Sequence, residues 1–151
     1  MPQSLAQIYL HVVFSTKHRV PNLRNRSLRE QTHAYLTGTC RHLDSPSIAV
    51  GGVEDHVHIL CRLAKTLCAS DLVRELKRES SKWLKEQGEE LGTFYWQNGY
   101  GAFSISPGHV ERLTQYIANQ EEHHHTETFQ DEFRRLLNLY EIPFDENYVW
   151  D

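Results

Sequence analysis

The order of strand-like and helix-like segments limits the possible folds of this 151-residue chain more than any other feature. Apolar, β-branched and aromatic residues alternating with polar ones predict strands, whereas apolar residues three or four apart predict helices. The expected elements are a strand at 8–15, a helix at 25–43, strands at 48–53 and 56–63, a helix at about 70–87, extended segments at 94–96 and 102–106, and helices at about 107–124 and 129–140. This order predicts an α+β fold with a ferredoxin-like, split β-α-β-β-α-β antiparallel sheet and additional C-terminal helices.

Local signals set some of the expected boundaries and leave others open. Ser70 is expected to cap one helix, and Ser106 to cap another that has Pro107 in its first turn. The segments at 94–96 and 102–106 predict either a hairpin or one interrupted strand. The tail at residues 143–151 carries Phe144, Tyr148 and Trp150, so we expect it to dock on the rest of the molecule.

Composition indicates an ordinary globular protein, with 39% hydrophobic and 24% charged residues. The length fits a single domain at residues 1–151. No apolar run approaches the roughly 18 residues that a membrane span needs, and no secretory signal is recognisable. Cys40, Cys61 and Cys68 show no CxxC spacing. They are therefore expected to be reduced thiols in a cytoplasmic protein.

The formal net charge of −4 argues mildly against a partner made of phosphates. Binding depends on where the charges lie, however, and the cations gather in two stretches. These stretches contain Lys17, His18, Arg19, Arg24, Arg26 and Arg29, and then Arg74, Lys77, Arg78, Lys82 and Lys85. A solvated helix face explains either cluster as well as a DNA surface does.

His56-Val57-His58 is the sharpest chemical feature of the sequence. Residues two apart in a strand point to the same side, so both imidazoles project together while Val57 points to the opposite face. Neutral imidazole is a good ligand for divalent metals, and two in register form half of a site. An isolated pair of this kind also fits two histidines on a solvated sheet face.

Tyr116 and Gln120 supply a possible second half of that site. Four residues apart in an expected helix, they share one face beside the apolar residues Val110, Leu113 and Ile117. The Gln120 carbonyl oxygen is a reasonable third ligand for magnesium or manganese. A tyrosine hydroxyl is a weak nucleophile that needs such a metal to polarise its target.

Three consecutive histidines follow, at positions 123, 124 and 125. Neighbouring helical residues splay about 100° apart, so these three cannot converge on one ion. A solvated helix end explains them, since imidazolium suits the C-terminal dipole. His124 lies on the Tyr116–Gln120 side and is a candidate accessory group.

In combination, several segments of this sequence resemble a known family, the single-tyrosine HUH transposases of the smallest bacterial insertion sequences and their domesticated, palindrome-associated relatives. No single segment is decisive, but their joint occurrence in this order is highly specific. They are VVFSTKHR at 12–19, EDHVHIL at 54–60, LKRESSKWL at 76–84, FYWQNGYGAFS at 94–104 and YIANQEEHH at 116–124.

This resemblance implies a homodimer that cleaves and rejoins single-stranded DNA bearing hairpins, without a nucleotide cofactor. It implies Tyr116 as nucleophile, forming a 5′-phosphotyrosine, with His56, His58 and Gln120 as ligands of a divalent ion, magnesium or manganese. In such transposases the tyrosine helix of one subunit commonly completes the site of the other. Recognition of hairpins relies on shape and on bases displaced from stacking.

The residues expected to contact DNA come from the basic stretches and one aromatic turn. They are Lys17, Arg19, Arg24, Arg74, Lys77, Arg78, Lys82 and Tyr100. Tyr100 is also the rival nucleophile, although it lacks a helical glutamine partner. Three hypotheses remain: an active strand transferase, a non-catalytic DNA-binding descendant of one, and a metal hydrolase that uses the same histidines with water.

Overall fold

The computed structural model describes residues 2–151 and contains one four-stranded antiparallel sheet. Its strands are β1 (Tyr9–Ser15), β2 (Ser47–Gly52), β3 (His56–Arg62) and β4 (Gly101–Ile105), in the spatial order β2-β3-β1-β4. Each neighbouring pair is antiparallel. The expected α+β class with a split β-α-β-β-α-β sheet is confirmed.

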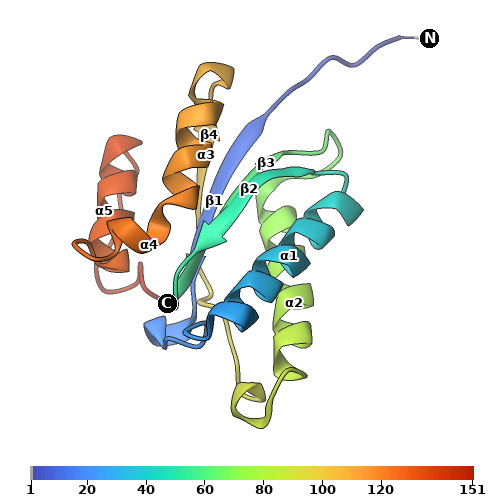
Figure 1. The fold of residues 1–151 in the computed structure, drawn as a ribbon. Coiled ribbons are helices and arrows are strands. Elements are labelled where there is room, and N and C mark those ends of the chain that lie inside the picture. The colour runs from blue at the N-terminus through green and yellow to red at the C-terminus, as the bar shows by residue number, and fades with distance from the viewer. Residues whose placement is uncertain (1) are drawn as a thin grey trace.

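One face of the sheet is covered by α1 (Arg26–His42) and α2 (Ala69–Lys85), the two crossover helices (Figure 1). Alternate residues of β1 and β3 point into this layer, since successive strand side chains point to opposite faces. The residues that build this core from the two central strands are Leu10, Val12, Phe14, Val57, Ile59 and Cys61. Asn25 begins α1 by accepting a hydrogen bond from the backbone N–H of Leu28 at 2.9 Å.

The opposite face carries the C-terminal helices α3 (Val110–Ala118), α4 (Gln120–His123) and α5 (Phe129–Leu139) (Figure 1). A second apolar cluster holds α5 to this face. It consists of Val13, Phe103, Phe129, Phe133, Leu136 and Leu137. The sheet therefore lies between two layers of helices. Side chains of β1 and β3 that point to this second face lie between the sheet and the C-terminal helices.

In the described part of the chain, residues 2–151, three 3₁₀ turns complete the secondary structure: Lys17–Arg19, Glu89–Leu91 and Pro107–His109. One expected boundary is wrong, because the helix α2 begins before Ser70, with Cys68 at its N-cap. Ser106 does occupy an N-cap position, with Pro107 in the first turn, as expected. Its hydroxyl makes no capping bond to the backbone and pairs with His109 Nδ1 at 2.6 Å.

The expected helix at 107–124 is divided at Asn119 into α3 and α4. The extended segments at 94–96 and 102–106 do not form a hairpin with each other, because β4 pairs with β1. Trp96 instead forms an isolated bridge to Thr16 and is buried.

The tail docks through Trp150, whose ring packs near Phe129, whereas Tyr148 remains 71% exposed. Within residues 2–151, no helix combines the length and apolarity that crossing a membrane requires.

Candidate active site

His56 and His58 project from β3 into the layer between the sheet and the C-terminal helices. Both are fully buried, and Val57 between them points into the opposite core. Strand geometry alone places the two imidazoles on one face, as expected. The solvated-face interpretation of this pair is therefore wrong.

A neighbouring side chain holds the Nδ1 atom of each imidazole. Asp55 Oδ1 lies 2.7 Å from His56 Nδ1, and His11 Nε2 lies 2.8 Å from His58 Nδ1. His11 is itself buried, and its ring stacks on that of His58. Both Nε2 atoms are left facing the same space. Metal-binding histidines are typically oriented by such a partner on the second ring nitrogen.

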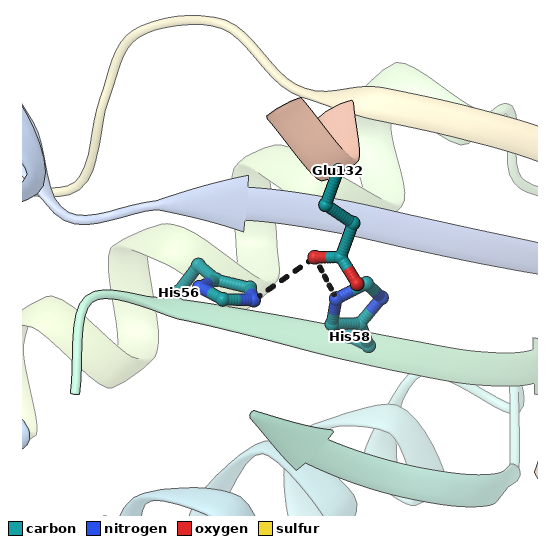
Figure 2. A group of neighbouring side chains, drawn as sticks. All are labelled: His56, His58 and Glu132. Atoms are coloured by element: carbon teal, nitrogen blue, oxygen red, sulfur yellow. Dashed lines mark hydrogen bonds and ion pairs between the residues drawn. The ribbon is translucent and has the colours of Figure 1, made fainter. Parts of the chain in front are cut away.

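The carboxyl group of Glu132, from α5, occupies that space. Its Oε1 atom lies 3.2 Å from His56 Nε2 and 3.0 Å from His58 Nε2 (Figure 2). The sequence analysis missed this residue. A signal was present, because Glu132 lies between Phe129 and Phe133 on the buried stripe of an amphipathic helix. A carboxylate in that position needs a specific partner.

Gln120 and His124 close the same space from α4 and its C-terminal end. Gln120 Oε1 lies 3.1 Å from His56 Nε2, and Gln120 Nε2 donates to Glu132 Oε2 at 3.0 Å. His124 Nε2 lies 3.1 Å from both Gln120 Oε1 and Glu132 Oε1. His124 therefore belongs to the cluster and is not merely part of a solvated helix end.

Tyr116 stands at the border of this cluster. Its hydroxyl donates a hydrogen bond to Glu132 Oε2 and accepts one from Arg135 Nη2 at 2.8 Å. The rings of Tyr116 and His58 lie 5.9 Å apart, and His123 packs on the Tyr116 ring at 4.5 Å. One chain thus brings the predicted nucleophile beside the predicted metal ligands.

Tyr116 also lines an open groove of about 290 Å³ between α3 and α5. The groove has apolar walls formed by residues such as Leu113 and Leu136, together with the basic side chains of Arg112 and Arg135. Such a lining suits a nucleotide, whose base is flat and apolar on its faces and whose phosphate is negative.

Burial and hydrogen bonding together set the charges of the cluster. Burial opposes protonation of His56, but hydrogen bonds to Asp55 and Glu132 outweigh it and raise its pKa to about 9. Burial lowers the pKa of His58, since its contact with Glu132 compensates only in part. Burial also opposes the charge of Glu132, yet the surrounding imidazoles hold its pKa far below the ordinary value.

The pKa of Tyr116 shifts in the opposite direction. Burial and the adjacent charge of Glu132 raise it well above its ordinary value, against the smaller effect of Arg135. The phenol is therefore protonated near neutral pH. It needs a proton acceptor and an activated target in order to act as a nucleophile.

The donor set fits a divalent metal. His56, His58 and Glu132 each offer a ligand atom within 4.8 Å of the others. Their chemistry, two imidazole nitrogens and a carboxylate oxygen, is typical of protein metal centres.

The residues expected to bind DNA lie outside this cluster, and several contact other groups of the chain. Arg24 pairs with Glu54, and Arg74 and Arg78 pair with acidic neighbours on α2. Exposed pairs of this kind contribute little to stability. Arg19 donates to the carbonyl of Trp150 at 2.8 Å.

Lys77 is engaged more deeply than these arginines. Its ammonium donates to the carbonyls of Gln97 and Gly99, at 2.7 Å each, and to that of Asn98 at 3.2 Å. It also lies 5.8 Å from the centre of the Tyr100 ring. Burial lowers its pKa to about 8. These contacts indicate that Lys77 fixes the loop before β4, and that Tyr100 belongs to this loop.

Comparison with known proteins identifies the family of this chain. A family model described as "Transposase IS200 like" matches residues 4–120. A candidate transposase from Deinococcus radiodurans R1 has a similar structure, with a TM-score of 0.62 and 20% identity, over 80% of this chain and 95% of that one. A REP-associated tyrosine transposase bound to a REP hairpin also has a similar structure. Its TM-score is 0.60 and its sequence identity is 13%, over 82% of this chain and 73% of that one.

The two structural likenesses show a shared fold. No curated protein matches the chain. The family model, however, covers well over half of its residues, and the chain therefore belongs to the IS200-like transposases.

Proposed function

We propose that this transposase cleaves and rejoins single-stranded DNA through a covalent bond between Tyr116 and a 5′-phosphate. The observation that carries the proposal is the contact of one buried carboxylate with both parts of the site. Glu132 Oε2 accepts the Tyr116 hydroxyl, while Glu132 Oε1 faces the Nε2 atoms of His56 and His58. Nucleophile and metal ligands are thereby held together.

In the first step the Tyr116 oxygen attacks the phosphorus atom of a phosphodiester. A bond forms between that oxygen and phosphorus, the bond to the 3′ oxygen breaks, and the phenol proton passes to Glu132 Oε2. The leaving 3′ oxygen takes a proton from solvent. Arg135, which donates to the Tyr116 oxygen, stabilises the negative charge that develops there.

In the second step a 3′-hydroxyl of another strand end attacks the phosphotyrosine. Phosphorus exchanges the Tyr116 oxygen for the new 3′ oxygen, the attacking hydroxyl releases its proton to solvent, and the Tyr116 oxygen recovers its proton from Glu132 Oε2. Each step replaces one phosphoester by another, so no nucleotide cofactor is required.

His56, His58 and Gln120 would hold a divalent ion in this site. When bound, such an ion polarises the scissile phosphate and stabilises the leaving oxygen. The residues of this chain contribute the fixed orientation, because Asp55 and His11 lock the two imidazoles.

The DNA substrate is proposed to carry a hairpin, as in the REP-hairpin complex of the structurally similar transposase. The groove beside Tyr116 would receive the single strand, with Arg112 and Arg135 facing its phosphates. Assembly as a homodimer remains a prediction from the family resemblance. The separation of 5.9 Å between the Tyr116 and His58 rings of one chain supports a site completed within that chain.

A covalent-adduct assay tests this function. The protein is incubated with hairpin-bearing single-stranded DNA and Mg²⁺ or Mn²⁺, then denatured and separated by electrophoresis. We expect a protein–DNA adduct that Tyr116→Phe abolishes, whereas Tyr100→Phe retains it. Free 5′-phosphate products without an adduct would instead indicate a hydrolase. Binding without any cleavage would indicate a DNA-binding descendant.

A further inference from the structure

The space between β3 and the C-terminal helices collects more potential ligands than the three that the family resemblance supplies. His124 and Glu132 join His56, His58 and Gln120 there. The separations of the imidazole Nε2 atoms from Glu132 Oε1 are 3.2 Å for His56, 3.0 Å for His58 and 3.1 Å for His124. Gln120 Oε1 is 3.1 Å from the Nε2 atoms of His56 and His124.

These nitrogen–oxygen separations are hydrogen-bond distances, and they also match adjacent corners of a coordination shell. Ligands about 2.1 Å from one ion lie roughly 3.0–3.4 Å apart when they occupy neighbouring positions. The side chain of His124 is only 10% exposed, although Glu121, Glu122 and His125 around it are exposed. Its ring also packs on that of His56, with 4.5 Å between the ring centres.

The hydrogen bonds behind the cluster suit the ligation of a metal ion. A metal at His58 Nε2 requires the ring proton on Nδ1, where His11 Nε2 can accept it at 2.8 Å. At His56, Asp55 accepts the Nδ1 proton at 2.7 Å. Each ring therefore already has a partner that suits the metal-binding tautomer.

We infer that this centre uses His124 and Glu132 as additional ligands, and that it selects a first-row transition-metal ion such as Mn²⁺, Co²⁺ or Zn²⁺ over Mg²⁺. The inference rests on the proposed function only in that the centre holds a metal. Three imidazoles with one carboxylate and one amide oxygen favour such ions, because Mg²⁺ prefers oxygen ligands and retains its water. Five protein ligands leave one octahedral position for a phosphate oxygen.

Metal titration of the full chain without DNA tests the inference. The protein is stripped with a chelator, dialysed and titrated with Co²⁺, and binding is followed by visible absorption. His124→Asn is expected to weaken Co²⁺ binding about 10–100-fold, the range found for disturbed metal sites. The matched control His125→Asn, one residue further along, should bind as the wild type does. Circular dichroism checks that each variant is folded.

Competition experiments test the selectivity and the role of the carboxylate. Zn²⁺ should displace Co²⁺ at comparable concentration and Mn²⁺ only in excess, whereas Mg²⁺ in about 100-fold excess should not displace it. Glu132→Gln should weaken Co²⁺ binding at least as much as His124→Asn does. Tighter binding in Glu132→Gln would show that the carboxylate occupies the place of the ion, and would overturn the inference. Unchanged affinity in His124→Asn, or displacement by Mg²⁺, would overturn it as well.

Failure of this inference and failure of the proposed function have different signatures. A Tyr116 adduct formed with Mg²⁺, together with unchanged affinity in His124→Asn, would overturn only the ligand set. Co²⁺ binding that depends on His124, without an adduct under any metal, would overturn only the strand-transfer function.

Discussion

The Tyr116 hydroxyl donates its hydrogen bond to Glu132, a residue that lies on a different helix and faces the paired histidines of β3. This contact joins two groups that the sequence presents separately. It gives the phenol proton an acceptor, and it fixes the side chain of Tyr116 against α5. The same carboxylate contacts both the nucleophile and the metal ligands. Substitutions near Tyr116 should therefore change adduct formation, and substitutions near the histidines should change metal affinity.

Arg135 offers the most selective test of the nucleophile's surroundings. Arg135→Gln removes the donor to the Tyr116 oxygen, and we expect adduct formation to slow by about 10–100-fold, as for loss of one charge-stabilising donor. Metal affinity should remain unchanged, because Arg135 contacts Tyr116 and Glu127 rather than the histidines. Arg134→Gln is the matched control, since Arg134 pairs with Glu146 at the surface. Equal slowing in both variants would refute this role.

His11 should act as a positioning residue for His58. His11→Phe keeps an aromatic ring near its neighbour Phe103 but removes the hydrogen bond to His58 Nδ1. We expect metal affinity to fall about 10–100-fold, with the effect visible in the absence of DNA. His42→Phe, at the end of α1 on the other face, should leave affinity unchanged. Calorimetric titration with Mn²⁺ distinguishes the two outcomes.

Metal affinity should rise with pH because a proton competes with the ion for His56. Hydrogen bonds to Asp55 and Glu132 outweigh burial and raise the pKa of His56 to about 9. Below that pH the ion must displace one proton, so the apparent affinity should increase about tenfold per pH unit and level off near pH 9. Asp55→Asn should move the levelling point to lower pH. An affinity independent of pH between 6.5 and 9 would contradict the assignment.

Gly51 in β2 should be required for the close packing of α3, the helix that carries Tyr116, against the sheet. A Cβ atom at this position in β2 would lie 2.6 Å from the carbonyl oxygen and 2.8 Å from Cγ2 of Ile117. Gly51→Ala should therefore cost about 1–3 kcal/mol of unfolding free energy and slow adduct formation, since Ile117 adjoins Tyr116. Gly38→Ala, in α1 with no atom within 4 Å of the new Cβ, should stabilise the protein by about 0.5–1 kcal/mol. Denaturant unfolding of both variants measures the difference.

Several features of the site follow from local periodicity and were predictable. The alternation in β3 places His56 and His58 on one face regardless of what covers them, because successive strand residues point to opposite sides. Spacing by four residues places Tyr116 and Gln120 on one side even though Asn119 divides the helix. Both relationships span a few residues, so the backbone geometry decides them.

The charge distribution was not predictable in this way. The basic stretch around Arg24–Arg29 looked available for DNA, yet Arg26 and Arg29 pair with Glu121 at 2.9 and 2.7 Å. Glu121 is remote in sequence and arrives there only because α4 packs near β2. Pairing of charges is a property of the folded surface, and net charge carries no information about it.

The sequence by itself determined the order of strands and helices along the chain, the common face of the two histidines and the family resemblance, all of which depend on local pattern and chain order. Only the tertiary structure decided that Glu132 and His124 complete the cluster. The position of Glu132 depends on how Phe129 and Phe133 pack α5 against Val13 and the rest of the sheet. Such packing joins segments far apart in the chain through apolar contacts that have no direction of their own, and no local pattern specifies which side chains they bring together.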